Sequence, residues 1–244
     1  HGKSTLLQAL QEGVYNHIPK DGREYVLTDE TAVKLRSEDG RFIRDTDISL
    51  FINDLPNGKN TKSFSTSDAS GSTSQAAGIA ESMEAGSRLL LIDEDTSATN
   101  FMVRDALMQE VINRSSEPIT PFTDRAKQLW EEEGISTILV AGSSGAFFYL
   151  ADTILQMTEY EPENITEKAK EICRKYANIS QKPPTAFRMP ESRRVMSWPE
   201  ELTAEKKKHK PLKIKAHGKD GFSIGKNQVD LRYTEQITDS EQTA

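Results

Sequence analysis

Apolar residues along this chain gather in continuous runs rather than in strict alternation with polar residues. RLLLID (88–93) and STILVAG (136–142) are almost wholly apolar, which is typical of strands buried on both faces of a parallel sheet. ADTILQM (151–157) has a similar pattern and is predicted to be a third buried strand. Weaker strand patterns, separated by acidic or Asp-Gly turns, occur at EYVLT (24–28), AVKLR (32–36) and RFIRDTDISLFI (41–52).

Segments with helical periodicity alternate with these runs. At the start of the chain, Leu6, Leu7 and Leu10 recur at helical spacing after a Ser-Thr pair, which predicts a helix over residues 1–12. Further helices are predicted at residues 74–84, 99–113 and 121–133, and a loop rich in Asn, Gly, Ser and Thr at residues 53–75. Strand and helix therefore alternate through the centre of the chain, which predicts an α/β fold with a three-layer core and a mostly parallel sheet.

The character of the sequence changes near residue 160. Residues 1–160 contain the α/β pattern and are predicted to form the core domain. Residues 161–244 begin with a helical segment at 165–176, continue with a Lys/Arg-rich stretch that contains prolines, and end with a strand and the start of a helix. We therefore expect a C-terminal region that is partly linker and includes a small α+β element.

The composition is that of an ordinary globular chain. Charged residues make up 28% of the 244 residues and the net charge is −7, which argues against a general attraction to nucleic acid or to anionic membranes. Cys173 is the single cysteine, so no internal disulfide can form, as expected in a reducing compartment. No apolar run is long enough for a membrane helix. We expect a soluble intracellular protein without a membrane partner, in the cytoplasm or alternatively in an organelle.

One segment is basic although the chain as a whole has a negative net charge. KKKHKPLKIK (206–215) is strongly basic. It is interpreted either as a solvated linker or as a surface that contacts the phosphate backbone of RNA or another nucleic acid, an interaction that would weaken with salt. No aromatic residues interleave with the lysines, so base stacking has no support in this segment.

The first residues of the chain, HGKST, have the composition of the second half of a phosphate-binding loop. In such a loop Gly2 allows close approach of the backbone, Lys3 adds positive charge near the phosphates, and the Ser4 hydroxyl ligates Mg²⁺. Thr5 follows directly behind this serine. The first glycine of the loop, and the strand that leads into it, are expected before residue 1. We therefore expect this fragment, expressed alone, to bind ATP poorly, to lack activity and to aggregate.

A pair of carboxylates follows the apolar run at 88–93. Asp93 ends the predicted strand, at the edge where open α/β sheets bind ligands, and can hold Mg²⁺ there. Glu94 comes next and is placed to orient or deprotonate an attacking water, which makes it the candidate catalytic residue. The alternative is that both carboxylates only end the strand and cap the next helix.

Two further segments resemble motifs of ABC-type ATPases. DEDTSATN (93–100) is similar to the segment DEPTSALD, in which the Walker B carboxylates continue into the D-loop; the D-loop residues here are Ser97, Ala98, Thr99 and Asn100. ASGSTSQAA (69–77) resembles the signature LSGGQ that precedes Walker B; the signature residues here are Ser70, Gly71, Ser72 and Gln75. The resemblance implies that the signature binds the γ-phosphate of an ATP held by an opposite subunit, at the start of a helix.

Longer phrases make the resemblance more specific. The chain resembles the soluble, non-transporter ATPases of the ABC class through GVYNHIPKDGRE (13–24), ASGSTSQAA (69–77), LLLIDEDTSATNFM (89–102) and EPITPF (117–122). The resemblance implies the P-loop NTPase fold, ATP and Mg²⁺ as ligands, and a homodimer that sandwiches two ATP molecules head to tail. His17, within the first phrase, either touches the nucleotide or packs on its own loop.

Two residues that ABC-type ATPases usually have are missing. No glutamine occurs between Gln11 and Gln75, so the Q-loop glutamine is absent, and Asp47 is the expected substitute near the metal. The switch histidine is absent as well, and Ser143 and Ser144 occupy its position. A serine can donate a hydrogen bond to the γ-phosphate but has no charge, so we expect slow turnover.

Two functions remain as alternatives. The first is an ATP-hydrolysing enzyme whose dimer closes and opens to act on a nucleic-acid or protein partner, and the intact pair Asp93-Glu94 favours it. The second is an ATP-dependent RNA- or protein-binding module with little or no hydrolysis, and the missing glutamine and histidine favour it. A P-loop kinase also uses the sequence GKST but does not need the serine-rich signature.

Overall fold

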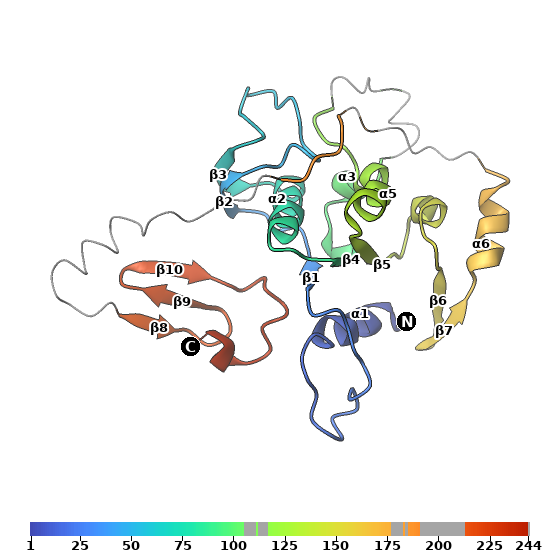
Figure 1. Cartoon of the computed structure of the whole chain (residues 1–244), viewed down its shortest axis with the longest axis horizontal. Coiled ribbons are helices and arrows are strands. Elements are labelled where there is room, and N and C mark those ends of the chain that lie inside the picture. The colour runs from blue at the N-terminus through green and yellow to red at the C-terminus, as the bar shows by residue number, and fades with distance from the viewer. Residues whose placement is uncertain (105–110, 112–116, 177–182, 184, 191–212, 244) are drawn as a thin grey trace. The chain divides into compact units, whose positions relative to one another are not determined.

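The computed structural model describes the chain outside residues 105–110, 112–116, 177–182, 184, 191–212 and 244 (Figure 1). The chain divides into two compact units, residues 1–191 and residues 192–244. The first unit contains all the predicted site residues and is therefore described in more detail. Among the described residues, no helix has both the length and the apolar character needed to cross a membrane.

A parallel sheet forms the centre of the first unit. β4 (Leu89–Asp93) lies between β1 (Ala32–Leu35) and β5 (Ser136–Val140), and both pairings are parallel. The inner residues of β4 are completely buried, as expected for a strand that is covered on both faces. The two long apolar runs and the weaker AVKLR pattern are thereby confirmed as strands.

Helices cover both faces of this sheet. On one face, Leu7 of α1 (Lys3–Glu12) packs with Leu91 of β4. On the other face, Leu90 and Ile92 belong to a core cluster with side chains of α2 (Gly71–Glu84), α3 (Thr99–Met102) and α5 (Phe122–Glu133). Successive β4 side chains thus point to opposite faces, and Figure 1 shows α1 on the opposite side of the sheet from α2 and α5. The predicted three-layer α/β core is confirmed.

Three phenylalanines hold the larger of these faces together. The side chains of Phe51, Phe101 and Phe122 are almost completely buried, and the ring centroid of Phe51 lies 5.0 Å from that of Phe101 and 6.4 Å from that of Phe122. Burying one such side chain is worth about 1.5–3 kcal/mol, and ring contacts add to it. The cluster therefore fixes α3 and α5 to the segment that follows β2.

A two-stranded antiparallel sheet occupies part of the region that the sequence predicts to be a loop. β2 (Arg41–Thr46) pairs with β3 (Phe64–Ala69), and β3 falls inside the predicted loop at 53–75. Its sequence, FSTSDA, has few apolar residues. It forms a strand because β2 supplies the partner hydrogen bonds, which a local pattern does not reveal.

The prediction of a third buried strand at 151–157 is wrong. β6 (Leu155–Thr158) instead pairs antiparallel with β7 (Glu161–Asn164). The residues between them, Glu159 and Tyr160, have φ values of 51° and 72°, which fits the tight two-residue turn of a hairpin. Leu155 is half exposed, so the apolar pattern here does not mark a strand covered on both faces.

The predicted strand at EYVLT (24–28) is also wrong. Tyr25 and Leu27 are 96% and 82% exposed, and the segment is irregular. A backbone hydrogen bond from Thr28 N–H to the Gly13 carbonyl closes the segment as a loop between α1 and β1. β-Branched and aromatic residues favour a strand only when they find a neighbour to pack on.

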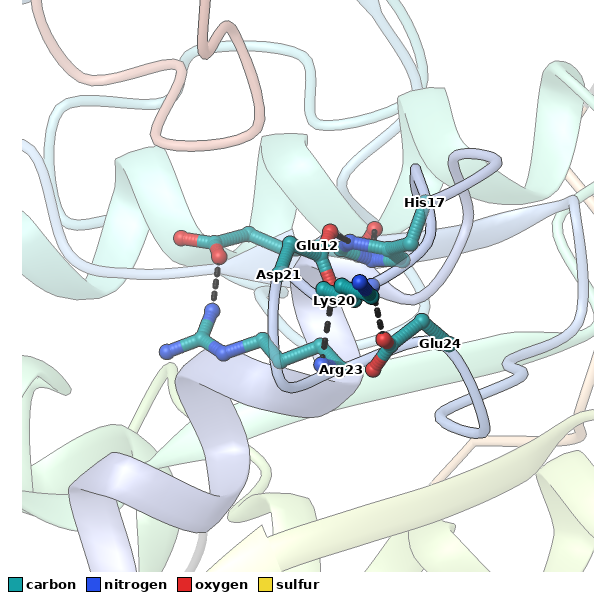
Figure 2. A network of polar contacts seen from close by, with 6 residues as sticks. All are labelled: Glu12, His17, Lys20, Asp21, Arg23 and Glu24. Atoms are coloured by element: carbon teal, nitrogen blue, oxygen red, sulfur yellow. Dashed lines mark hydrogen bonds and ion pairs between the residues drawn. The ribbon is translucent and has the colours of Figure 1, made fainter.

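A network of polar contacts gives this loop its shape (Figure 2). Arg23 pairs with Glu12 at the end of α1. His17 Nδ1 lies 2.7 Å from Asp21 Oδ2, and His17 Nε2 lies 3.3 Å from the Glu12 carbonyl oxygen. Asp21 has a lowered pKa, chiefly because the Arg23 N–H donates to it. His17 is therefore engaged by its own loop, as one of the two interpretations of this histidine predicts.

The remaining elements lie toward the C-terminus. α6 (Thr166–Cys173) follows β7 in the first unit. The second unit contains an antiparallel sheet of β8 (Ile214–Ala216), β9 (Gly221–Ile224) and β10 (Asn227–Asp230), in which β9 is central. The predicted strand in the tail is thus confirmed. Most of the basic segment 206–215, and most of the predicted helix 99–113 beyond α3, lie outside the described residues.

Candidate nucleotide site

The start of α1 combines a glycine in a left-handed conformation with a helix end that no side chain of the described residues caps. Gly2 precedes the helix with φ of 101°, and a Cβ atom there would lie 2.9 Å from Tyr160 Cα in the β6–β7 turn. Both observations require glycine at this position. Among the residues that the structure describes, no side chain caps this helix, so the first N–H groups of Lys3, Ser4 and Thr5 are available for an anion at the positive end of the helix dipole.

Ser4 meets the end of the central strand. Its hydroxyl donates to Asp93 Oδ2 over 3.3 Å, although the two residues are 89 positions apart in sequence. Asp93 is 7% exposed, and its other oxygen, Oδ1, accepts from the Asp95 N–H over 3.1 Å. A hydroxyl and a carboxylate are oxygen ligands of the kind that Mg²⁺ binds together with phosphate oxygens and water, so these two residues fit that ion.

Glu94 is held by the segment that follows β5. Its Oε2 accepts from the Gly142 N–H over 2.7 Å and from the Ser143 N–H over 3.1 Å, and its Oε1 accepts from the Ser143 hydroxyl over 2.7 Å. Burial is the largest single influence on its pKa and raises it. The hydrogen bonds from the Ser143 hydroxyl and from the N–H groups of Ser143 and Gly142, with a smaller influence of the Ser144 N–H, together outweigh burial and lower the pKa of Glu94 below its ordinary value. Glu94 is therefore a carboxylate at neutral pH.

The sheet explains why these groups meet. β4 and β5 run parallel in a register that places Asp93 opposite Val140, so the residues after each strand leave from the same edge. β1 ends at this edge as well, and the Ser37 N–H donates to the Thr96 carbonyl over 2.9 Å. Sequence reasoning missed Ser37; the polar SED after the apolar AVKL of β1 was the signal available for it.

The predicted signature begins α2. Ser70 is the exposed N-cap, and its hydroxyl accepts from the Thr73 N–H over 3.4 Å and lies 3.3 Å from the hydroxyl of the nearly buried Ser72. Gly71 is packed against the β1 edge, because a Cβ atom on it would lie 2.2 Å from Ser37 Oγ. The signature is thus an N-capped helix start that packs directly on the edge where Asp93 lies.

Gln75 connects this helix with the D-loop of the same chain. It is completely buried, its Nε2 donates to Ser97 Oγ over 3.0 Å, and its Oε1 accepts from the Ala98 N–H over 3.0 Å. Ser97 Oγ in turn donates to the Asp93 carbonyl over 2.8 Å. The structure therefore turns Gln75 inward, whereas Thr99 and Asn100, also predicted as D-loop residues, are exposed at the start of α3.

Asp47 lies apart from this group. It follows β2, in a different sheet from Asp93, and its Oδ1 accepts from the N–H and the hydroxyl of Ser49 over 2.9 and 2.6 Å. Within the described part of the chain, no hydrogen bond joins Asp47 to Ser4 or Asp93. The structure gives Asp47 a turn-capping contact, and its role near a metal stays a prediction.

Comparisons with known proteins agree with this geometry. A family model of the ABC ATPase P-loop domain matches residues 1–193. An uncharacterized protein of Methanocaldococcus jannaschii is 30% identical over 185 residues, which are 74% of this chain and 40% of that protein. The chain thus spans less than half the length of this curated relative. The family match covers most of the chain and confirms the resemblance seen in the sequence: the chain belongs to the ABC ATPase P-loop domain family.

Proposed function

We propose that the protein binds ATP with Mg²⁺ and hydrolyses it slowly. The observation that supports this proposal is the meeting of Ser4, Asp93 and Glu94 at one edge of the parallel sheet, beside the uncapped start of α1. A phosphate binder needs the helix start, and a hydrolase also needs a carboxylate that can act on water. This chain has both within one family domain.

Each residue has a separate task in this proposal. The N–H groups at the start of α1 and the Lys3 ammonium bind the phosphates. Ser4 and Asp93 would hold Mg²⁺, which supplies positive charge to the phosphate oxygens during cleavage. Glu94 orients the attacking water and accepts its proton. Ser143 lacks the charge of a histidine, so turnover is slow.

The exposed N-cap of α2 supports a dimer. Ser70 is exposed, whereas Gly71, Ser72 and Gln75 are buried, so Ser70 is the signature residue that a phosphate held by a second subunit can reach. We propose a homodimer that encloses two ATP molecules head to tail, so that binding and hydrolysis close and open the pair. The partner moved by this cycle is a nucleic acid or a protein.

The second candidate is an ATP-dependent binding module with little hydrolysis. The contacts of Glu94 favour it, because three donors already occupy its carboxylate oxygens. ATP would then lock two subunits on RNA or protein without being consumed. The basic segment 206–215 is the candidate RNA contact, and RNA affinity that falls steeply with salt, and less steeply after lysine-to-alanine changes there, would support that contact.

Steady-state ATP hydrolysis by the full-length protein separates the two functions. We expect slow, Mg²⁺-dependent hydrolysis that Glu94→Gln abolishes while ATP binding persists. Glu131→Gln is the matched control, because Glu131 is an exposed α5 residue whose carboxylate, among the described residues, pairs only with Lys127 one turn earlier. If wild-type protein and Glu94→Gln are equally inactive while ATP still drives dimer formation in light scattering, the binding module is correct. If ATP does not bind at all, both proposals are wrong.

A further inference from the structure

The segment 142–144 forms an anion-binding site that is occupied by the protein's own carboxylate. Two successive backbone N–H groups, of Gly142 and Ser143, and the Ser143 hydroxyl all point at Glu94. Successive N–H groups of this kind bind anions such as phosphate. Gly142 and Ser143 are exposed, and no atom of the described residues lies within 4 Å of the position of a Cβ atom on Gly142. The site is therefore open to a second anion.

The same contacts limit what Glu94 can do. An ionised carboxylate has about four lone-pair positions, and three of them accept hydrogen bonds here. A general base needs a lone pair directed at the water that it deprotonates. Glu94 in this arrangement is consequently bound rather than poised for reaction.

An oxygen of the terminal phosphate would satisfy the same donors. The segment follows β5, the strand next to β4, so it leaves the sheet at the edge where Ser4 meets Asp93. Exchange of a carboxylate for a phosphate keeps the hydrogen bonds of Gly142 and Ser143 made, which offsets part of the cost of releasing Glu94.

We propose that residues 142–144 hold Glu94 until the terminal phosphate of ATP displaces it, and that this exchange releases Glu94 to act on water. The inference rests on the proposed function, because it regulates the same ATP site. ADP lacks the displacing phosphate and leaves Glu94 bound. Hydrolysis is thereby restricted to the state with ATP in place.

The preference for ATP over ADP tests the exchange in the full-length protein. In the wild-type protein, part of the free energy of ATP binding is used to displace Glu94. Removal of its carboxylate by Glu94→Ala should therefore strengthen ATP binding about tenfold and leave ADP binding unchanged. Asp95→Ala is the matched control. It removes a carboxylate from the next residue, whose exposed side chain forms no hydrogen bond with the described residues 142–144, and it should change the preference for ATP over ADP by less than about twofold.

A second variant distinguishes exchange from simple charge repulsion. Ser143→Ala removes a hydrogen-bond donor from both competing anions, the Glu94 carboxylate and the terminal phosphate. The gain in ATP affinity from Glu94→Ala should therefore fall to about threefold in the Ser143→Ala background. Ser143→Thr keeps the hydroxyl and should restore the full gain. Backbone amide resonances of Gly142 and Ser143 should move with ATP and not with ADP.

The outcomes separate this inference from the proposed function. An equal gain from Glu94→Ala with and without Ser143, or equal effects on ATP and ADP, would overturn the exchange even if Glu94 is needed for hydrolysis. Absence of ATP binding in the wild-type protein would overturn both. A larger ATP preference that depends on Ser143 supports the exchange.

Discussion

Replacing Gln75 with leucine would test whether the buried link between α2 and the D-loop holds this edge of the domain together. The change removes the amide that donates to Ser97 Oγ and accepts from the Ala98 N–H, and Gln75 has no exposed surface through which water could replace it. The Ala98 N–H would be left without its acceptor. An orphaned buried donor costs about 1–3 kcal/mol and the lost hydrogen bond to Ser97 about 1 kcal/mol more.

We therefore expect Gln75→Leu to lower the free energy of unfolding by about 2–4 kcal/mol, a large part of the 5–15 kcal/mol typical of a domain. Urea unfolding followed by circular dichroism measures it, and the midpoint should fall without a change in slope. Gln8→Leu is the matched control. Gln8 is exposed on α1 and, within the described part of the chain, its side chain bonds only to Glu12, so its replacement should cost less than about 0.5 kcal/mol.

Gln75→Leu should also disturb the position of Asp93, because Ser97, the partner of Gln75, donates a hydrogen bond to the Asp93 carbonyl. We expect Gln75→Leu to weaken Mg²⁺-dependent ATP binding, while Gln8→Leu leaves it unchanged. A Gln75→Leu protein with the stability of the wild type, within about 0.5 kcal/mol, would refute the argument that this amide is a structural connection.

Three further predictions concern packing and charge. Gly71→Ala should lower the free energy of unfolding by about 1–3 kcal/mol, because the new Cβ would lie 2.2 Å from Ser37 Oγ, and Ser37→Ala should restore most of the loss in urea unfolding. Phe101→Ala should cost about 3–5 kcal/mol, seen as a lower Tm, since the ring is completely buried against its aromatic neighbours. Hydrogen bonds from the Arg232 guanidinium lower the pKa of Asp230 to about 2. The depressed value means that this contact stabilises the fold above the ordinary pKa of an aspartate and is lost as the pH falls toward about 2. Arg232→Ala should bring the pKa of Asp230 back toward its ordinary value in an NMR titration, and an unchanged pKa would contradict the assignment.

The sequence predicted the central part of the fold because its signals there are local. The apolar run of β4 marks a strand covered on both faces, and the leucines of α1 mark one helical stripe. Asp93 follows that run directly, so its place at the carboxyl edge follows from the topology of parallel sheets. These inferences needed no knowledge of which segments pair.

The incorrect predictions concern segments whose structure depends on a partner distant in sequence. FSTSDA forms β3 because β2 pairs with it, whereas EYVLT has a strand-like composition and stays a loop without such a partner. Residues 151–157 have an apolar pattern but contribute to a hairpin whose turn is set by Glu159 and Tyr160. Strand propensity depends on neighbours, and neighbours distant in sequence are invisible to a local pattern.

By itself the sequence determined the types of group at the site: a glycine before α1 and a lysine at its first position, a serine and two carboxylates with the chemistry of Mg²⁺ and water, and a serine-rich helix start. Only the tertiary structure decided how they face one another. It bound Glu94 to Gly142 and Ser143, 48 and 49 positions away, and it turned Gln75 toward the D-loop. Both contacts depend on the register of β4 with β5 and on the packing of α2, which arise only when the whole sheet is assembled.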